Sequence, residues 1–359
     1  MSEPTGVRAS HALMSLTSTC SNACVFCGLA EHADLQANQA FPIDTLGALL
    51  AQGALAITFT GGEPTLVPDA LKEAVGAARA AGFRSIGVQT NGHAFAALAA
   101  PLASLGLTDV HLSVHGPNAT AHDYHTGKEG SFEALWNAAG AAHRAGLKVV
   151  ATTVLTRSNY RVLSEMATLL RARGVSAWQL SVPHARGRAQ AHFDRVYPRL
   201  GMAIPFALHA LETARRVQLP AFVSGAPLCL LGPLATRSIA STPRSFHTRC
   251  DGCAARAACP GVDALYLARF DGDELRPREA PASTADAEPH ASRFAGPGAL
   301  APLVEQVMHE PTQKARVSLP VVGRTQRAQN EVSTRDAKTG ERLREILPAL
   351  FEKRDEDET

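Results

Sequence analysis

The stretch Cys20-Ser-Asn-Ala-Cys24-Val-Phe26-Cys27 decides how the rest of this chain is interpreted. Its three thiols are separated by three residues and then by two. This spacing lets three thiolates converge on one soft-metal centre, one thiolate short of the four that usually close an iron–sulfur cluster. A metal site with one open coordination position has room for a reacting ligand. Two other interpretations stay open, namely three unrelated thiols or half of a zinc site.

The composition narrows the class of protein. The 359 residues are enough for one large core with an extension, or for two domains. The formal charge of +2 favours neither nucleic acid nor a membrane surface as a partner. No apolar run reaches 18 residues and the start of the chain lacks a signal-like pattern, so we expect a cytoplasmic protein. Seven cysteines, an odd count without a secretion signal, argue against a disulfide framework.

Strand-like and helix-like segments alternate between residues 13 and 217. The predicted strands are Leu13–Leu16, Leu55–Thr60, Arg84–Gln89, Asp109–His115, Leu147–Leu155 and Ala177–Val182. The predicted helices are Ile43–Ala51, Pro68–Ala81, Ala94–Ala100, Ser131–Ala145, Tyr160–Arg173 and Tyr197–Val217. Six such units predict an α/β fold with a parallel sheet. Because eight units complete a TIM barrel, we expect a partial (β/α)6 TIM-like barrel, with the thiols at the C-terminal end of its first strand.

The chain divides into four parts by composition. Residues 1–10 are polar and predicted to be flexible, and residues 11–217 form the partial barrel. Residues 218–275 carry the other four cysteines among Pro, Gly and Arg. A segment that buries so little apolar surface needs a cross-link, such as a bound metal, to fold. Residues 276–359 read as a linker and a C-terminal tail, in which Leu343 to Leu350 allow a short helix.

A second motif, Gly61-Gly62-Glu63-Pro64, follows the second predicted strand. Two glycines let a backbone bend sharply and approach a ligand closely, and a carboxylate there can hold an ammonium group. Alone, the motif could equally be an ordinary glycine-rich turn. One strand after a C-x3-C-x2-C loop with Phe26 before its last cysteine, it resembles the signature of the radical SAM superfamily.

The resemblance implies a set of cofactors and contacts. In that family a [4Fe–4S] cluster is held by three cysteines, here Cys20, Cys24 and Cys27, and its fourth iron binds S-adenosylmethionine (SAM). Glu63 in the Gly-Gly-Glu motif would bind the SAM amino group. Thr90-Asn91-Gly92 matches a family motif at the rim of the SAM pocket, and the backbone at Val182-Pro183 would meet the adenine. The activity implied is reductive cleavage of SAM to a 5′-deoxyadenosyl radical, which abstracts a hydrogen atom from a substrate.

The fourth predicted strand carries an unusual polar face. Alternation places His111, Ser113 and His115 on one side, toward the barrel lumen. A packed lumen usually carries bulky apolar residues, so this polar row indicates a site. Ser113 resembles the family's serine near the SAM ribose or methionine. His115 is our candidate catalytic residue, with a purely structural histidine as the alternative.

Further positions are candidates around this site. Where related enzymes often have an arginine for the SAM carboxylate, this chain has His125, with Lys128 as a possible substitute. Arg186 could meet an anionic group or could lie in a solvated loop. The candidates on the last two barrel strands are Thr152, Thr153, Gln179 and Ser181.

The four later cysteines follow the pattern Cys229-x20-Cys250-x2-Cys253-x5-Cys259. Four thiolates with a central C-x-x-C can bind zinc or a [4Fe–4S] cluster, and their spacing does not choose between the two. Their place after the sixth strand resembles the SPASM/Twitch extensions of radical SAM enzymes, which hold auxiliary clusters. The seven cysteines then divide into three and four with none left over.

This division predicts a radical SAM oxidoreductase. A fully protein-ligated auxiliary cluster would accept an electron from a radical on a peptide or small-molecule substrate, giving net oxidation. A reductase, flavodoxin or ferredoxin would supply electrons, and no nucleic acid or membrane partner is expected. The alternatives are a sugar or alcohol dehydrogenase of the same family, or a non-catalytic iron–sulfur or zinc-binding protein.

Overall fold

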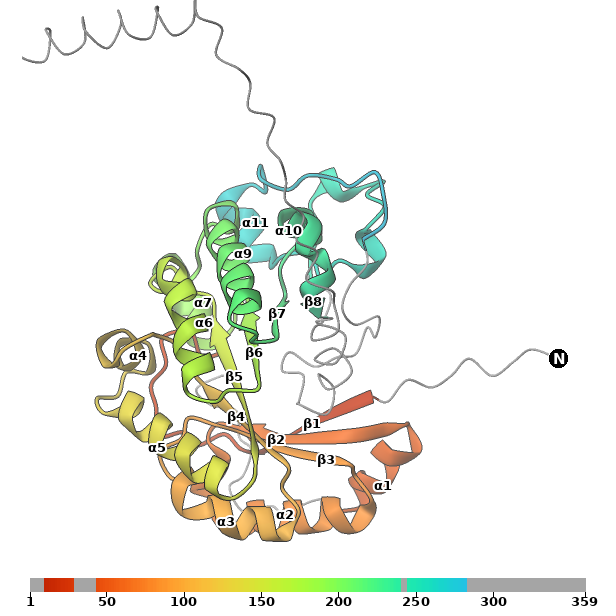
Figure 1. The fold of residues 1–359 in the computed structure, drawn as a ribbon. Helices are drawn as coiled ribbons and strands as arrows, with labels where there is room; N and C mark the ends of the chain where they lie inside the picture. The colour runs from red at the N-terminus through yellow and green to blue at the C-terminus, as the bar shows by residue number, and fades with distance from the viewer. Residues whose placement is uncertain (1–9, 29–42, 240–243, 283–359) are drawn as a thin grey trace, which may run out of the picture. The chain divides into compact units, whose positions relative to one another are not determined.

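The computed structural model describes residues 10–28, 43–239 and 244–282. In these residues eight strands form one sheet in sequence order, and every neighbouring pair is parallel. They are β1 Ser10–Thr17, β2 Ala54–Gly61, β3 Ser85–Thr90, β4 Asp109–Ser113, β5 Lys148–Val154, β6 Ala177–Ser181, β7 Ala221–Ser224 and β8 Ser238–Ile239. Within the described residues β1 does not pair with β8, so the predicted partial barrel is confirmed (Figure 1).

Helices follow most of the strands and cover the outer face of the sheet, as α2, α3 and α5 do in Figure 1. The helices are α1 Ile43–Ala51, α2 Pro68–Ala81, α3 Phe95–Leu105, α4 Ala119–Thr126, α5 Ser131–Arg144, α6 Leu163–Ala172, α7 Gly187–Ala191, α8 Phe193–Val196, α9 Leu200–Arg216, α10 Leu228–Leu231 and α11 Ala264–Phe270. Short 3-10 turns are η1 Pro64–Leu66, η2 Tyr160–Val162, η3 Gly232–Arg237, η4 Thr248–Cys250 and η5 Arg256–Ala258.

The sequence of α2 shows why such a helix forms where it does. Pro68 occupies the first helical turn, where its missing N–H costs nothing, and Asp69 beside it complements the helix dipole. Gly82 ends the helix in the left-handed region, with φ of 103°. Leu71 and Val75, one turn apart, are fully buried against the sheet.

The two faces of the sheet differ in chemistry. Val110 and Leu112 of β4 belong to the hydrophobic core under the helices. The alternate side chains point into the lumen, where His111 Nε2 lies 3.4 Å from Asp109 Oδ1. Nearby, His11 Nε2 lies 2.9 Å from Thr58 Oγ1. The polar lumen face predicted for this strand is therefore present, and β1 and β2 extend it.

Some elements differ from the prediction. β7 and β8 come from residues assigned by composition to the Cys-rich part, so the sheet has eight strands where six were predicted. With four and two residues they are too short to show a period. The helix α4 forms where no helix was predicted, and its start is capped by Asn118, whose Oδ1 accepts the N–H of Ala121.

Residues 244–282, here called the Cys-rich segment, follow β8 and carry three of the four later cysteines. An antiparallel bridge joins Ser245 to Val262, and α11 follows it. Tyr266 of α11 is fully buried, and its hydroxyl accepts the N–H of Leu200 at the start of α9. The predicted linker from residue 283 onward, the predicted tail helix and residues 1–9 lie outside the described residues.

Candidate functional site

The loop of residues 18–28, here called the Cys loop, leaves β1 and packs directly on the Gly61–Gly62 turn that ends β2. Gly62 N–H donates to Thr17 O at 2.6 Å, and Glu63 N–H donates to Thr19 O at 2.8 Å. A Cβ atom on either glycine would collide with the backbone of Thr17 or Thr19. Glycine at these two positions thus lets the Cys loop and the turn after β2 pack backbone against backbone. This packing is a different reason for the glycines than the close approach of a ligand that the sequence predicts.

A cavity of about 110 Å³ opens between this turn and the ends of β3 and β4. All three thiols of the Cys loop line it, so the structure brings Cys20, Cys24 and Cys27 together. Most of the other predicted site residues line it as well, namely Phe26, Gly61, Gly62, Glu63, Asn91, Ser113 and His115. A second cavity of about 270 Å³ shares Phe26, Cys27 and Gly61 with the first and includes Val182. The two cavities are adjoining parts of one site.

Glu63 is the best-anchored polar residue of the site. Its carboxylate is 1% exposed and accepts four hydrogen bonds. Oε1 receives the N–H and hydroxyl of Thr65 and the hydroxyl of Thr90, while Oε2 receives the N–H of Asn91 at 2.7 Å. This carboxylate therefore fixes the turn at the end of β3. It also brings a buried negative charge to the wall of the cavity.

Burial changes the acidity of the thiols in the Cys loop. It raises the pKa of Cys24 to about 12, and neighbouring Cys20 and Cys27 raise it further while Arg188 lowers it. Burial also raises the pKa of Cys20. Buried thiols in this state favour the protonated form, and a bound metal centre reverses that preference because it binds the thiolate. The donor set fits a thiolate-bound cluster, since three sulfurs face one cavity with room for a further ligand.

His115 belongs to a group of buried rings behind the Cys loop. Its ring centroid lies 4.4 Å from that of Phe26 and 5.9 Å from that of His122, onto which it stacks. Its Nδ1 accepts the N–H of Val154 at 3.4 Å, so Nε2 carries the proton of the neutral ring. Burial lowers the pKa of His115 well below its usual value, and His122 and His125 lower it further. Near neutral pH the ring is therefore uncharged and held against the Cys loop.

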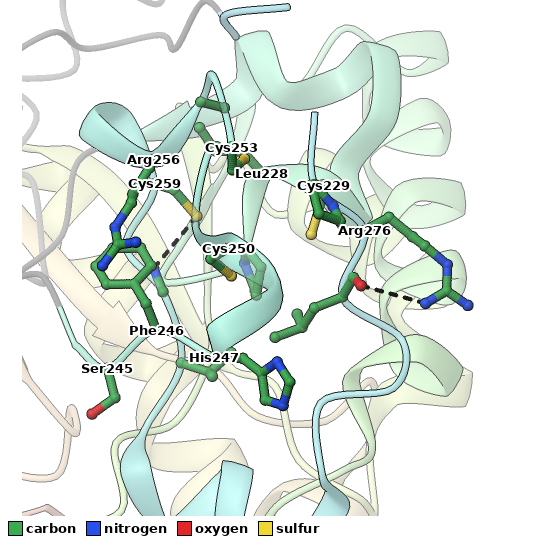
Figure 2. A pocket seen from close by; sticks show the side chains of 16 residues that line it. Leu228, Cys229, Ser245, Phe246, His247, Cys250, Cys253, Arg256, Cys259 and Arg276 are labelled. Carbon is green, nitrogen blue, oxygen red and sulfur yellow. Dashed lines mark hydrogen bonds between the residues drawn. The ribbon is translucent and has the colours of Figure 1, made fainter. Parts of the chain in front are cut away.

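The four later cysteines line one common cavity with largely apolar walls, shown in Figure 2. Cys229 comes from α10, between β7 and β8, whereas Cys250, Cys253 and Cys259 come from the Cys-rich segment. Backbone N–H groups point at two of the sulfurs, from Gly261 to Cys259 at 3.5 Å and from Arg278 to Cys253 at 3.3 Å. Burial raises the pKa of Cys229 and of Cys250. Four sulfurs around one cavity fit a fully protein-ligated metal centre.

Within residues 10–28, 43–239 and 244–282, no group of three or more His, Cys, Asp or Glu side chains is close enough to hold a single metal ion. A four-iron cluster takes each thiolate on a different iron atom and does not need that proximity. Across the same ranges, no helix has the length and apolar character needed to cross a bilayer.

Several predicted residues lie away from the cavities. Pro64 starts η1 and does not line either of them. His125, which stands where related enzymes often have an arginine, has both ring nitrogens occupied, by Ala121 O at 2.6 Å and Thr156 Oγ1 at 2.8 Å. Thr153 faces the helices and donates to Val114 O, so the lumen position on β5 belongs to Thr152. Arg186 is exposed at the start of α7, and Lys128 lines neither cavity.

Two residues of the site were not among the residues predicted from the sequence. Gln89 of β3 lines both cavities, and its Oε1 accepts the hydroxyl of Thr60 at 3.0 Å. The Nε of Arg188 on α7 donates to Cys24 O at 3.0 Å, although 164 positions separate the two residues in the chain. Strand alternation could have found Gln89, which occupies a lumen position. Only the folded chain brings Arg188 to the Cys loop.

Comparison with known proteins agrees with this geometry. Residues 14–170 match the model of the Radical SAM superfamily. A curated relative, the AdoMet-dependent heme synthase of Nitratidesulfovibrio vulgaris, is 28% identical over 186 residues, which cover 50% of this chain and 50% of the relative. The chain thus spans about half the length of this relative.

Two solved structures share the fold. SuiB of Streptococcus suis bound to S-adenosylmethionine superposes with a TM-score of 0.50 at 16% identity, covering 63% of this chain and 52% of SuiB. The FeFe-hydrogenase maturase HydG of Carboxydothermus hydrogenoformans gives a TM-score of 0.50 at 18% identity, covering 64% of this chain and 57% of HydG. Residues 14–170 thus resemble the Radical SAM superfamily in sequence, and the three thiols that share one cavity agree with that resemblance.

Proposed function

We propose that this chain is a radical SAM enzyme that holds a [4Fe–4S] cluster on Cys20, Cys24 and Cys27 and binds SAM in the adjoining cavities. The observation that carries this proposal is the common cavity, in which the three thiols face Glu63 and Ser113. A site built for zinc alone would give no reason for an open cavity beside the thiols that Glu63, Asn91 and Ser113 line.

When bound, the cluster and SAM together supply a 5′-deoxyadenosyl radical that abstracts a hydrogen atom from the substrate. The chain's own residues would bind and orient SAM and the substrate. The buried charge of Glu63 attracts the SAM ammonium group, and Asn91 is held at the rim by Glu63 and by Ser21 Oγ. Ser113 offers a hydroxyl, and Val182 lines the larger cavity, where its backbone would meet the adenine. His115 is our candidate for substrate contact, as a neutral hydrogen-bond donor.

We propose a second [4Fe–4S] cluster on Cys229, Cys250, Cys253 and Cys259, in a Twitch-like arrangement. The shared cavity and the N–H groups aimed at the sulfurs support it, since such hydrogen bonds stabilise the reduced state of iron–sulfur centres. With every iron held by protein, this centre suits electron acceptance better than substrate binding. The net reaction would be oxidation of a peptide or small molecule, and a sugar or alcohol dehydrogenase is one form of that reaction.

The relatives support the use of SAM, which the name of the heme synthase states for that protein. The match covers about half of this chain and half of the heme synthase, so the substrate of this chain is a proposal. We further propose a cytoplasmic location, with a reductase, flavodoxin or ferredoxin as electron donor. A non-catalytic iron–sulfur or zinc-binding protein is the competing function.

Anaerobic reconstitution with iron and sulfide tests the proposal. We expect about eight irons per wild-type chain, four for each cluster, and about four in a Cys20→Ala, Cys24→Ala, Cys27→Ala variant. With dithionite and SAM, the wild type should form 5′-deoxyadenosine, detected by mass spectrometry, and the triple variant should form none. At saturating SAM, the matched Cys229→Ala, Cys250→Ala variant should still form 5′-deoxyadenosine and should lose the auxiliary irons. Bound zinc without SAM cleavage in the wild type would contradict the proposal.

A further inference from the structure

Two side chains of the Cys-rich segment, Arg244 and Asp263, grip the loop that follows β6. Arg244 Nη1 donates to Pro183 O at 3.4 Å and to Asp263 Oδ2 at 3.0 Å. Asp263 Oδ2 in turn accepts the N–H of Ala185 at 3.3 Å. The pair therefore supplies a donor to one backbone group of this loop and an acceptor to another, two residues further along.

The same pair is anchored to the barrel at two more points. The hydroxyl of Tyr197, just before α9, donates to Asp263 Oδ2 at 2.9 Å and lies 3.1 Å from Arg244 Nη1. Arg244 Nη2 donates to Gly225 O at the end of β7. Gly225 has φ of 77°, and a Cβ atom there would collide with Arg244 Nη2. Glycine at this position therefore leaves room for the guanidinium.

Because the ion pair of Arg244 and Asp263 is largely buried, the loss of one partner should have a large effect on the fold around it. The side chain of Arg244 is 6% exposed and that of Asp263 is 16% exposed. Removal of one partner leaves the other charge buried without compensation, whereas an apolar pair of similar size can be tolerated. Surface pairs of the same type contribute little by comparison.

Arg244 and Asp263 also sit at the base of the loop that carries three cysteines. Arg244 N–H donates to Pro260 O at 2.9 Å, and Ser245 and Val262 exchange two backbone hydrogen bonds of 2.9 Å. Cys250, Cys253 and Cys259 lie between these paired ends. A metal centre that orders this loop therefore orders the two side chains at its base.

We propose that Arg244 and Asp263 are positioning residues that connect the four-cysteine site to the SAM cavity. Val182, Pro183 and His184 line the larger cavity, and the pair fixes the backbone immediately around them. The four-cysteine segment thereby shapes the part of the larger cavity that Val182, Pro183 and His184 line, in addition to any role in electron transfer. This inference rests on the proposed function, because it places SAM against that wall.

The test measures the SAM dissociation constant of the anaerobically reconstituted full-length protein by equilibrium dialysis. We expect Asp263→Asn to weaken SAM binding about fivefold or more, in the range found for coupled sites. Arg244→Met, Asp263→Leu removes both buried charges, should fold, and should weaken binding to a similar extent because the grip on Pro183 and Ala185 is lost. Cys250→Ala, with the first cluster loaded, should shift binding in the same direction.

Glu274→Gln is the matched control. Glu274 pairs with Arg199 at 2.7 Å and likewise ties the start of α9 to the Cys-rich segment, but its polar partners Arg199, Gly201 and Tyr266 all lie outside residues 182–185. We expect unchanged SAM affinity in this variant, whatever happens to its melting temperature. If Arg244 and Asp263 had only a structural role, their variants would have a lower melting temperature and iron content. The SAM affinity of the loaded variant protein would then be unchanged.

The outcomes separate this inference from the proposed function. If the loaded wild type does not bind SAM, the proposed function fails. If the wild type binds SAM and both the Asp263→Asn and the Arg244→Met, Asp263→Leu proteins bind it equally well, the positioning role is overturned. Should Asp263→Asn not fold, the double variant and Tyr197→Phe, which loses only one hydroxyl, decide the question.

Discussion

A buried carboxylate needs compensation, and Glu63 obtains it from its own chain. Four donors on Thr65, Thr90 and Asn91 surround it. The residue therefore has two roles at once: it fixes the turn after β3 and it supplies charge to the cavity. The family resemblance predicted a charge that faces a ligand, and the role in the turn became visible only when β2 and β3 were paired.

We predict that Glu63→Gln destabilises the protein and weakens SAM binding. The amide NH2 must replace an acceptor that now faces N–H or O–H donors, and a buried group left without a partner costs about 1–3 kcal/mol. Urea unfolding and SAM dialysis measure the two effects. Glu73→Gln on the exposed side of α2 is the control and should change neither. Unchanged unfolding of Glu63→Gln would contradict the four-donor geometry.

His122 gives a pH prediction. Burial lowers its pKa to about 4, whereas an unfolded histidine titrates near 6.5. Between these values the unfolded chain binds the extra proton, so the free energy of unfolding falls as the pH falls from 6.5 toward 4. His122→Asn keeps an acceptor for the backbone N–H of His115 and removes the titrating ring.

The measurement is urea unfolding of metal-free protein at pH 7 and pH 5. The loss of stability over this interval should be about 2 kcal/mol smaller in His122→Asn than in the wild type. His143→Asn, at an exposed position on α5, is the control and should keep the wild-type loss. Equal losses in His122→Asn and the wild type would show that His122 is not held neutral.

At the scale of elements, the inner face of the sheet is polar where barrels are usually apolar. Asp109 Oδ2 accepts the hydroxyls of Ser85 and Thr108, and its Oδ1 faces His111. Gly87 on β3 lies opposite Asp109 and leaves the space that this carboxylate fills. The lumen faces of β3 and β4 thus form a polar cluster. Alternation along β4 alone predicted only part of it.

We predict that Gly87→Ala destabilises the protein by about 1–3 kcal/mol, as overpacking does. Its Cβ would collide with Asp109 Oδ1 and lie 2.9 Å from Thr58 Oγ1. Gly76→Ala is a control of opposite sign, because nothing lies within 4 Å of that Cβ in α2 and alanine is the better helix former. Thermal melts of both variants check the prediction, and a neutral Gly87→Ala would show that the lumen has spare room.

For the molecule as a whole, the barrel and the Cys-rich residues are not separable along the chain. β7 pairs with β6 although it belongs to the part that composition set apart. A chain ended after Val217 would lose β7 and leave the edge of β6 without its partner strand.

We predict that residues 1–217 alone do not fold cooperatively, whereas residues 1–282 keep the melting behaviour of the described fold. Circular dichroism melts of the two truncated proteins and the full chain compare them directly. A cooperative melt of residues 1–217 at the full-length temperature would show that β7 and the Cys-rich segment are dispensable to the barrel.

The sequence by itself determined the local features of this protein. It identified the three-thiol loop, the Gly-Gly-Glu turn, the division of seven cysteines and the first six strands, because spacing and periodicity are encoded over a few neighbouring residues. The tertiary structure decided which distant groups meet: Arg188 at the Cys loop, Cys229 with the other three cysteines, and Arg244 with Asp263 beside the larger of the two adjoining cavities. The physical reason is that these contacts join side chains from different elements, and only the packing of strands β6 to β8 against the Cys-rich segment sets their distances.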